Sequence, residues 1–149
     1  QTWTEPGATR LFHEALKAMR SHWHAIDEDG RGNLALGILE TEAQCHTACL
    51  AVGRDGTVLT LRLTVRLGRI RRNHVPALLA LWKLQAATQA ARFVPDLDDG
   101  DVRLEATAFL SDTCDPAFVV QAVVRDVRTI LEDDRLLAVV SPEPVRQAS

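Results

Sequence analysis

The sequence predicts an α+β domain, in which helices pack on one face of an antiparallel five-stranded sheet. Apolar residues alternate along several short segments, and they recur every three to four residues along three longer ones. Short turn sequences join the alternating segments, so neighbouring strands are expected to be antiparallel. The expected order is α-β-β-β-α-β-β-α in one domain of 149 residues. Its core should cover about residues 8–140, and residues 141–149 should form a flexible tail.

The first expected element is a helix from about Ala8 to Asp27. Its apolar residues recur at helical spacing. They are Leu11, Phe12, Leu16, Met19, Trp23 and Ile26. The sequence Asp27-Glu-Asp-Gly-Arg-Gly32 should end this helix, because Asp and Gly favour turns.

Three strands are expected next, at about 33–39, 43–52 and 59–67. In the first, alternate apolar residues share one sheet face: Leu34, Leu36 and Ile38. In the second, the shared face consists of His46, Ala48, Leu50 and Val52. The sequence Gly53-Arg-Asp-Gly56 predicts a hairpin. In the third strand, Leu and Val alternate with Thr and Arg, which indicates one buried and one solvated face.

The segment from Pro76 to Arg92 predicts a helix with more apolar surface than one small domain needs. Its large apolar side chains cover an arc of roughly 220°, against about 100° for an ordinary surface helix. Lys83 is the one charged residue between Pro76 and Arg92. One side can pack on the parent domain, so we expect the other side to bind a protein partner. The expected interface residues are Leu78, Leu79, Leu81, Trp82, Leu84 and Phe93.

Two strands and a helix complete the expected order. A short strand at Arg92–Leu97 leads through the turn Asp98-Asp-Gly-Asp101 into a strand at Val102–Leu110. The inward residues of the second strand should be Val102, Leu104, Ala106, Ala108 and Leu110. Asp115-Pro116 is a typical helix start. Valines at helical spacing follow it, so periodicity predicts a helix in spite of the β-branched composition.

The sequence favours neither a metal site nor catalysis. On a strand, Cys45 and Cys49 face one way and His46 the other, so the three side chains should not converge on one ion. Residues 27–33 and 96–101 lack the ligand pattern of a calcium loop and are expected to be turns. The sequence has none of the common nucleophile, phosphate-loop or zinc-protease motifs. We therefore expect no enzyme and no cofactor. Three cysteines, an odd number, favour reduced thiols in the cytoplasm.

An alternative function is a nucleic-acid-associated accessory protein. A basic stripe could contact phosphates. It consists of Arg62, Arg66, Arg69, Arg71 and Arg72. However, the net charge is −3, the sequence has no Tyr, and no aromatic side chains alternate with these arginines. Cross-strand pairing of the strand arginines with Glu105 is the competing explanation.

The sequence resembles the YbjN family of bacterial proteins, which in turn look like type III secretion chaperones. Four segments carry the resemblance. They are Gly53-Arg-Asp-Gly56 with the strand Leu59–Val65, Val75-Pro76 with the helix Leu78–Leu84, the stretch Arg92–Leu104, and the closing Val-rich helix. The resemblance extends from about Ala8 to Val140. It implies a homodimer, often built around the middle helix and the neighbouring strand, which binds a client protein without catalysis or cofactor.

Overall fold

The computed structural model describes residues 5–20, 23–28, 34–41, 44–56, 58–71, 74–96, 98–111 and 115–141. Its elements are α1 (Glu5–Met19), β1 (Trp23–Glu28), β2 (Leu34–Glu40), β3 (Cys45–Asp55), β4 (Val58–Ile70), α2 (His74–Gln85), β5 (Ala91–Pro95), β6 (Asp101–Leu110), α3 (Pro116–Leu131), α4 (Asp134–Val139) and β7 (Val140–Ser141). The strands form one antiparallel sheet in the order β1-β2-β3-β4-β6-β5, and β7 pairs with β4. The predicted α+β class is confirmed, although the described residues form a sheet of seven strands in place of five.

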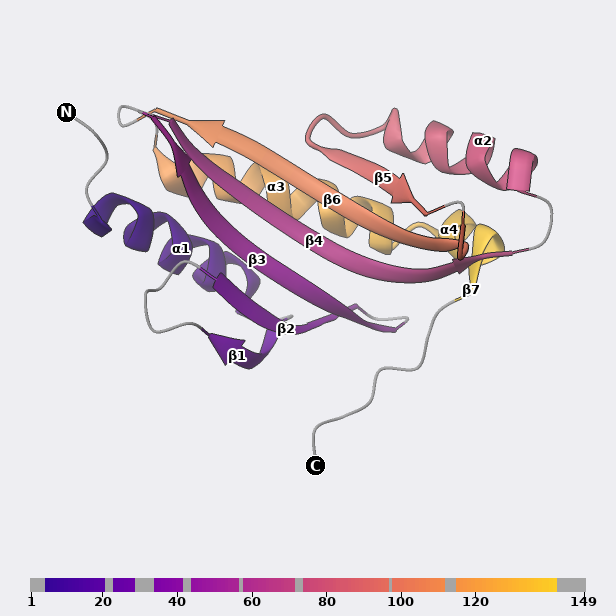
Figure 1. The fold of residues 1–149 in the computed structure, drawn as a ribbon, viewed down its shortest axis with the longest axis horizontal. Helices are drawn as coiled ribbons and strands as arrows, with labels where there is room; N and C mark the ends of the chain where they lie inside the picture. The colour runs from indigo at the N-terminus through magenta and orange to yellow at the C-terminus, as the bar shows by residue number, and fades with distance from the viewer. Residues whose placement is uncertain are drawn as a thin grey trace.

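Two long helices cover one face of the sheet. α1 and α3 lie side by side behind the strands in Figure 1, with α1 against β3 and β4 and α3 against β5 and β6. α2 packs against β5 and α4 at the β5 edge of the sheet. The described helices leave the opposite face of the sheet open, and we call it the outer face. None of these helices is long and apolar enough to cross a membrane.

The central strands have the alternation that the sequence predicts. In β4 the five expected core residues from Leu59 to Leu67 are buried, and Arg62 and Arg66 between them are exposed. In β6 the inward side chains are buried from Val102 to Leu110, apart from the half-buried Ala108. Alternation is reliable here because one face of each strand packs on helices and the other meets solvent.

The first helix is shorter than predicted. α1 ends at Met19, and the backbone N–H of Arg20 donates to the carbonyl of Lys17 over 3.3 Å. Residues Trp23–Glu28 form β1, which pairs with β2 from Trp23 opposite Leu39 to Glu28 opposite Ala35. The prediction of a helix to Asp27 is wrong because this ladder is a non-local interaction, which local periodicity does not report.

The apolar residues of β2 lie on an unexpected face. Leu34 and Leu36 belong to the outer face and are 40% and 41% exposed, whereas Ala35 and Leu39 are buried. The ring of Trp23 lies so close to Gly37 that a Cβ there would be 2.5 Å from Trp23 Cζ2. On the helix-covered face of β2, the indole of Trp23 occupies the space that a side chain at position 37 would need, so a glycine stands there.

The C-terminal part adds elements that the sequence did not predict. α3 begins as expected, since the Asp115 side chain accepts a hydrogen bond from the N–H of Ala117 over 3.1 Å. After α3, the short α4 begins at a second aspartate cap, Asp133. β7 then pairs with the end of β4, beyond the part of β4 that pairs with β3. Residues 142–149, most of the expected tail, lie outside the described residues.

Candidate protein-interaction site

α2 has one buried side and one apolar exposed side. Ala77, Leu81 and Leu84 pack into the core. On the opposite side, Val75, Leu79 and Trp82 are 67%, 53% and 68% exposed. These three residues are spaced four and three apart, so they form one continuous row. We call this row the α2 stripe.

The structure places the predicted interface residues in different environments. Leu79 and Trp82 are exposed as expected, and Leu78 and Phe93 are half-buried. Leu81 and Leu84 are buried in the core, so the prediction that all six form one accessible surface is wrong. The 3.6-residue period of the helix turns these two away from the stripe. Val75 is not among the predicted residues, and it continues the exposed row towards the start of α2.

Two polar side chains fix the segment that follows α2. Gln85 Oε1 accepts a hydrogen bond from the backbone N–H of Phe93 over 2.8 Å. Asp126 Oδ2, on the buried side of α3, accepts from the N–H groups of Gln89 and Ala90 over 3.1 and 2.9 Å. Asp126 thus ties the α2–β5 connection to α3. A sequence signal existed, because a carboxylate falls among the core valines of α3.

The outer face of β4, β5 and β6 carries paired charges. Glu105 Oε1 lies 3.0 Å from Arg92 Nη2 and 3.6 Å from Arg62 Nε. Asp101 Oδ2 lies 3.3 Å from Arg66 Nη2. The predicted cross-strand pairing of strand arginines with Glu105 is therefore present in the structure.

The five predicted basic residues do not form one stripe. A bulge between Arg66 and Gly68 breaks the register of β4, and Gly68 adopts a φ of 131°, which favours glycine. Beyond the bulge, Arg71 donates from Nε to the carbonyl of Leu137 in α4 over 3.0 Å. Arg72 lies outside the described residues. Arg69 stays on the outer face with Arg62 and Arg66, opposite Asp101 and with Nε 3.8 Å from Asp101 Oδ1. The other arginines of this face come from β5 and β6.

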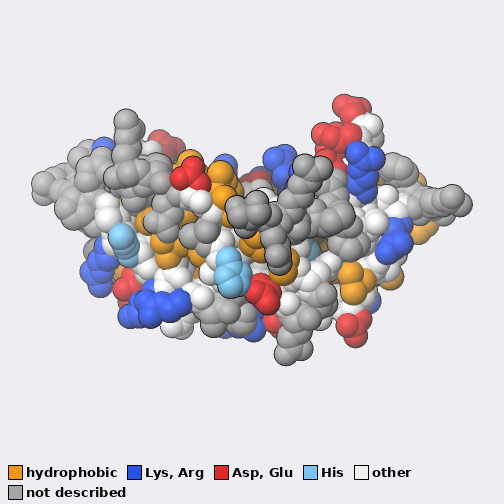
Figure 2. All heavy atoms as spheres, turned by 90° about the horizontal axis from the view of Figure 1, so that it is seen from below, with side chains coloured by type: hydrophobic (Ala, Val, Ile, Leu, Met, Phe, Trp, Pro, Cys, Tyr) orange, Lys and Arg blue, Asp and Glu red, His pale blue; other side chains and the backbone are white. Residues whose placement is uncertain are grey.

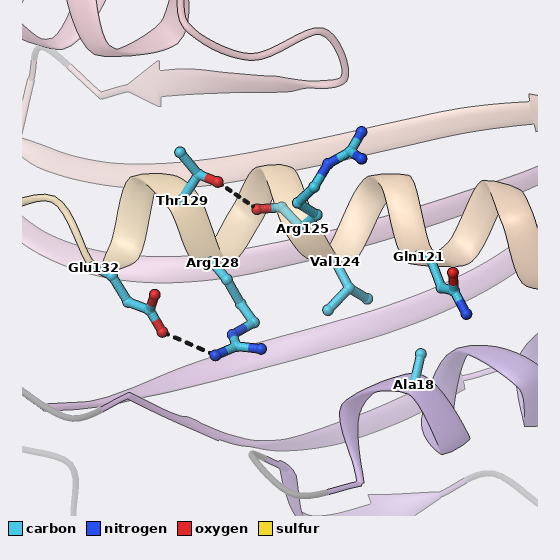
Figure 3. A pocket seen from close by; sticks show the side chains of 7 residues that line it. All are labelled: Ala18, Gln121, Val124, Arg125, Arg128, Thr129 and Glu132. Atoms are coloured by element: carbon cyan, nitrogen blue, oxygen red, sulfur yellow. Dashed lines mark hydrogen bonds and ion pairs between the residues drawn. The ribbon is translucent and has the colours of Figure 1, made fainter.

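A hollow of about 330 Å³ lies between α1 and α3 on the other side of the molecule (Figure 3). Its polar lining is mostly engaged within α3 itself. Arg128 Nη2 donates to Glu132 Oε1 over 3.1 Å, and Thr129 Oγ1 donates to the carbonyl of Arg125 over 2.8 Å. These bonds within one helix hold no nucleophile against a base, so this hollow gives no reason to assign a reaction to it.

Cys45, Cys49 and His46 lie as the strand geometry predicts. Cys45 and Cys49 are free thiols on the outer face, and His46 is buried on the helix-covered face. Burial raises the pKa of the Cys49 thiol, which disfavours a reactive thiolate. Among the described residues, no three His, Cys, Asp or Glu side chains are grouped so that they could hold a metal ion.

The loop between β5 and β6 is a turn held by its own aspartates. The N–H of Asp98 donates to Asp96 Oδ1 over 3.0 Å, and that of Asp101 donates to Asp99 Oδ1 over 2.9 Å. Gly100 has a φ of 78°. The local hydrogen bonds and the positive φ confirm the predicted turn.

Comparison with known proteins identifies a fold and no close relative. A scan against protein-family models finds no match, and a search of curated protein sequences finds none either. Among solved structures, the chain is similar to the crystal structure of YbjN from E. coli, which is described as a candidate transcription regulator. The similarity has a TM-score of 0.51 at 15% identity and covers 91% of this chain and 96% of that one. The chain therefore has a YbjN-like fold.

Proposed function

We propose that this protein is a non-enzymatic, cytoplasmic protein-binding module that forms a homodimer through the α2 stripe. Exposure of the stripe carries the proposal, because Leu79 and Trp82 remain in water while the opposite side of the same helix is buried. Large aromatic and aliphatic side chains are enriched in the buried centres of interfaces. A two-fold dimer would bring the two stripes together and leave each outer face accessible to a client.

The test is the molar mass in solution, measured by light scattering after size exclusion at micromolar concentration. The wild-type protein should elute as a dimer. Trp82→Glu should give a folded monomer, because the side chain is exposed within one subunit and a charge at the centre of the interface is costly. A monomeric wild type would contradict the dimer. A Trp82→Glu variant that stays dimeric would place the interface elsewhere.

A matched control separates the stripe from the added charge. Gln121→Glu introduces the same charge at an exposed position of α3. It should leave the dimer intact. Circular dichroism of both variants checks that each keeps the wild-type secondary structure, so that loss of the dimer is not confused with unfolding.

The alternative is a nucleic-acid-associated accessory protein. The arginines that gather on the outer face, Arg62 and Arg66 among them, support it. So does the similarity in fold to a candidate transcription regulator. Phosphate contacts predict that the affinity for a nucleic acid falls steeply as salt rises. Titration with labelled DNA and RNA at several salt concentrations tests this, and affinity that does not depend on salt would exclude it.

A further inference from the structure

The outer face of the sheet combines an apolar half with a basic half. Leu34 and Leu36 of β2 expose their side chains there, and Ile26 of the neighbouring β1 is also exposed. Figure 2 looks at the molecule from below the view of Figure 1, towards the β1 edge of the sheet, and hydrophobic side chains are visible at that surface. β4, β5 and β6 form the other half of the face with five described arginines: Arg62, Arg66, Arg69, Arg92 and Arg103.

The strand register places the two halves next to each other. Leu34 pairs with Ala51 of β3, which in turn pairs with Arg62 of β4. Adjacent strands are about 4.8 Å apart, so the backbones that carry Leu34 and Arg62 are about 10 Å apart. A bound segment of about three extended residues, or about two helical turns, could contact both halves.

The charges of the basic half are only partly neutralised on this face. Its five arginines outnumber the carboxylates beside them, which are Glu105, Asp101, and Asp96 and Asp99 of the β5–β6 loop. Arg103 stands directly opposite Arg66 across the β4–β6 ladder, an arrangement of like charges, and Asp96, Asp99 and Asp101 line the same hollow. Arg103 makes no hydrogen bond or ion pair with the described residues. On the other side of the apolar half, Asp27 of β1 pairs with Leu36.

We infer that the outer face binds an acidic amphipathic segment of a partner protein, with apolar side chains on Leu34 and Leu36 and carboxylates over Arg62 and Arg103. Charge complementarity selects the acidic end and the exposed leucines select the apolar end. Nucleic acid fits less well, because the apolar half is aliphatic and, among the described residues, Phe109 of β6 is the single exposed aromatic side chain of this face on which a base could stack. The inference rests on the proposed function only in that the partner is a protein, and it does not require the dimer.

The probe is a short fluorescein-labelled peptide with leucines in one half and glutamates in the other, titrated with the full chain by fluorescence anisotropy. Two control peptides replace the glutamates by lysines or the leucines by serines, and a labelled single-stranded DNA of similar length is the competing ligand. The acidic amphipathic peptide should bind at least about tenfold more tightly than each of the other three, a difference of about 1.4 kcal/mol. Its affinity should fall moderately as salt rises.

Variants locate the site. Leu36→Ser and Arg103→Glu should each weaken binding of the acidic peptide by about tenfold or more. The same two changes elsewhere, Leu79→Ser on the α2 stripe and Arg125→Glu on α3, should alter it by less than about twofold. The inference is overturned by failure of the peptide to bind, by equal binding of a control peptide or tighter binding of the DNA, or by equal effects of the control variants.

Light scattering on the same samples separates this inference from the proposed dimer. Leu36→Ser and Arg103→Glu should keep the molar mass of the wild type. A monomeric wild type that binds the acidic peptide would contradict the dimer alone. A dimer that does not bind it would contradict the inference alone.

Discussion

At the scale of single residues, Gly37 is where a side chain would conflict most directly with the fold. A Cβ at this position would lie 2.5 Å from Trp23 Cζ2 and 2.8 Å from the carbonyl oxygen of His24. Backbone atoms cannot move aside as a flexible side chain can, so Gly37→Ala should lower the free energy of unfolding by about 2 kcal/mol. Urea denaturation followed by circular dichroism measures this change.

Gly53 provides the matched control. It lies in β3, and a Cβ there would meet no atom within 4 Å. Gly53→Ala should therefore leave stability within about 0.5 kcal/mol of the wild type, or raise it slightly by restricting the unfolded chain. Equal losses for the two variants would mean that Trp23 does not lie over Gly37 in solution.

Because His46 is buried, the protein should lose stability at mildly acidic pH. Burial lowers the pKa of its imidazole below 6.5, although the hydrogen bond from Nδ1 to the Arg66 carbonyl, over 3.3 Å, opposes this shift. Well above pH 6.5 the ring is neutral in both the folded and unfolded states, so His46 does not make the free energy of unfolding depend on pH there. As the pH falls through 6.5, the unfolded chain binds the proton first. The free energy of unfolding should then decrease by up to about 1.4 kcal/mol per pH unit, until the folded pKa is reached.

The measurement is urea denaturation between pH 7.5 and pH 5, compared with His46→Gln. The amide does not titrate in this range, so the variant should show a smaller loss of stability than the wild type over the same interval. Exposed histidines such as His13 and His24 are present in both proteins, which makes the difference between the two slopes specific to His46. Parallel slopes would contradict a buried neutral ring.

At the scale of elements, Asp126 is the main attachment of the α2–β5 connection to α3. Its Oδ2 accepts from the N–H groups of Gln89 and Ala90, which would lose this acceptor in Asp126→Ala. Hydrogen bonds to a charged group are worth about 1.5–3 kcal/mol, so the variant should lose at least about 2 kcal/mol of stability. Hydrogen exchange of the Gln89 and Ala90 amides should also accelerate. Asp133→Ala, which removes a helix cap and an exposed ion pair with Arg135, should cost about 1 kcal/mol.

The elements differ in how far local sequence predicts them. β4 and β6 alternate strictly because each has one face on the helices and one in solvent, and α3 is marked by the Asp115 cap. In contrast, the segment from Trp23 to Glu28 fits a helical period as well as a strand. Its pairing with β2 decides the outcome, and that pairing joins residues up to 16 positions apart. Non-local hydrogen bonds of this kind leave no periodic signal in the segment itself.

At the scale of the whole molecule, dimerisation through the α2 stripe predicts that thermal stability depends on protein concentration. Association of folded subunits stabilises them by mass action, so the Tm should rise as the concentration increases. Differential scanning calorimetry over a hundredfold range of concentration measures this shift. Trp82→Glu should remove the dependence, while Gln121→Glu should retain it. A Tm that is constant for the wild type would show that the stripe is not covered by a second copy.

The two proposed surfaces lie on different parts of the molecule. The α2 stripe belongs to a helix beside the β5 edge, whereas the apolar half of the outer face lies on β1 and β2 at the opposite edge of the sheet (Figure 1). A partner could therefore occupy the outer face without displacing a second copy from α2. Separate surfaces also explain why variants in one are expected to leave the other unchanged.

By itself, the sequence determined the α+β class, the buried faces of β3, β4 and β6, and the excess of apolar surface on α2. Each of these follows from periodicity, because the spacing of side chains along one element sets which of them share a side. The tertiary structure alone decided which side of α2 is covered, that the leucines of β2 face outward, and that arginines from β5 and β6 join those of β4. These outcomes depend on which elements pack together, and the indole of Trp23 or the carboxylate of Asp126 acts on residues far away along the chain.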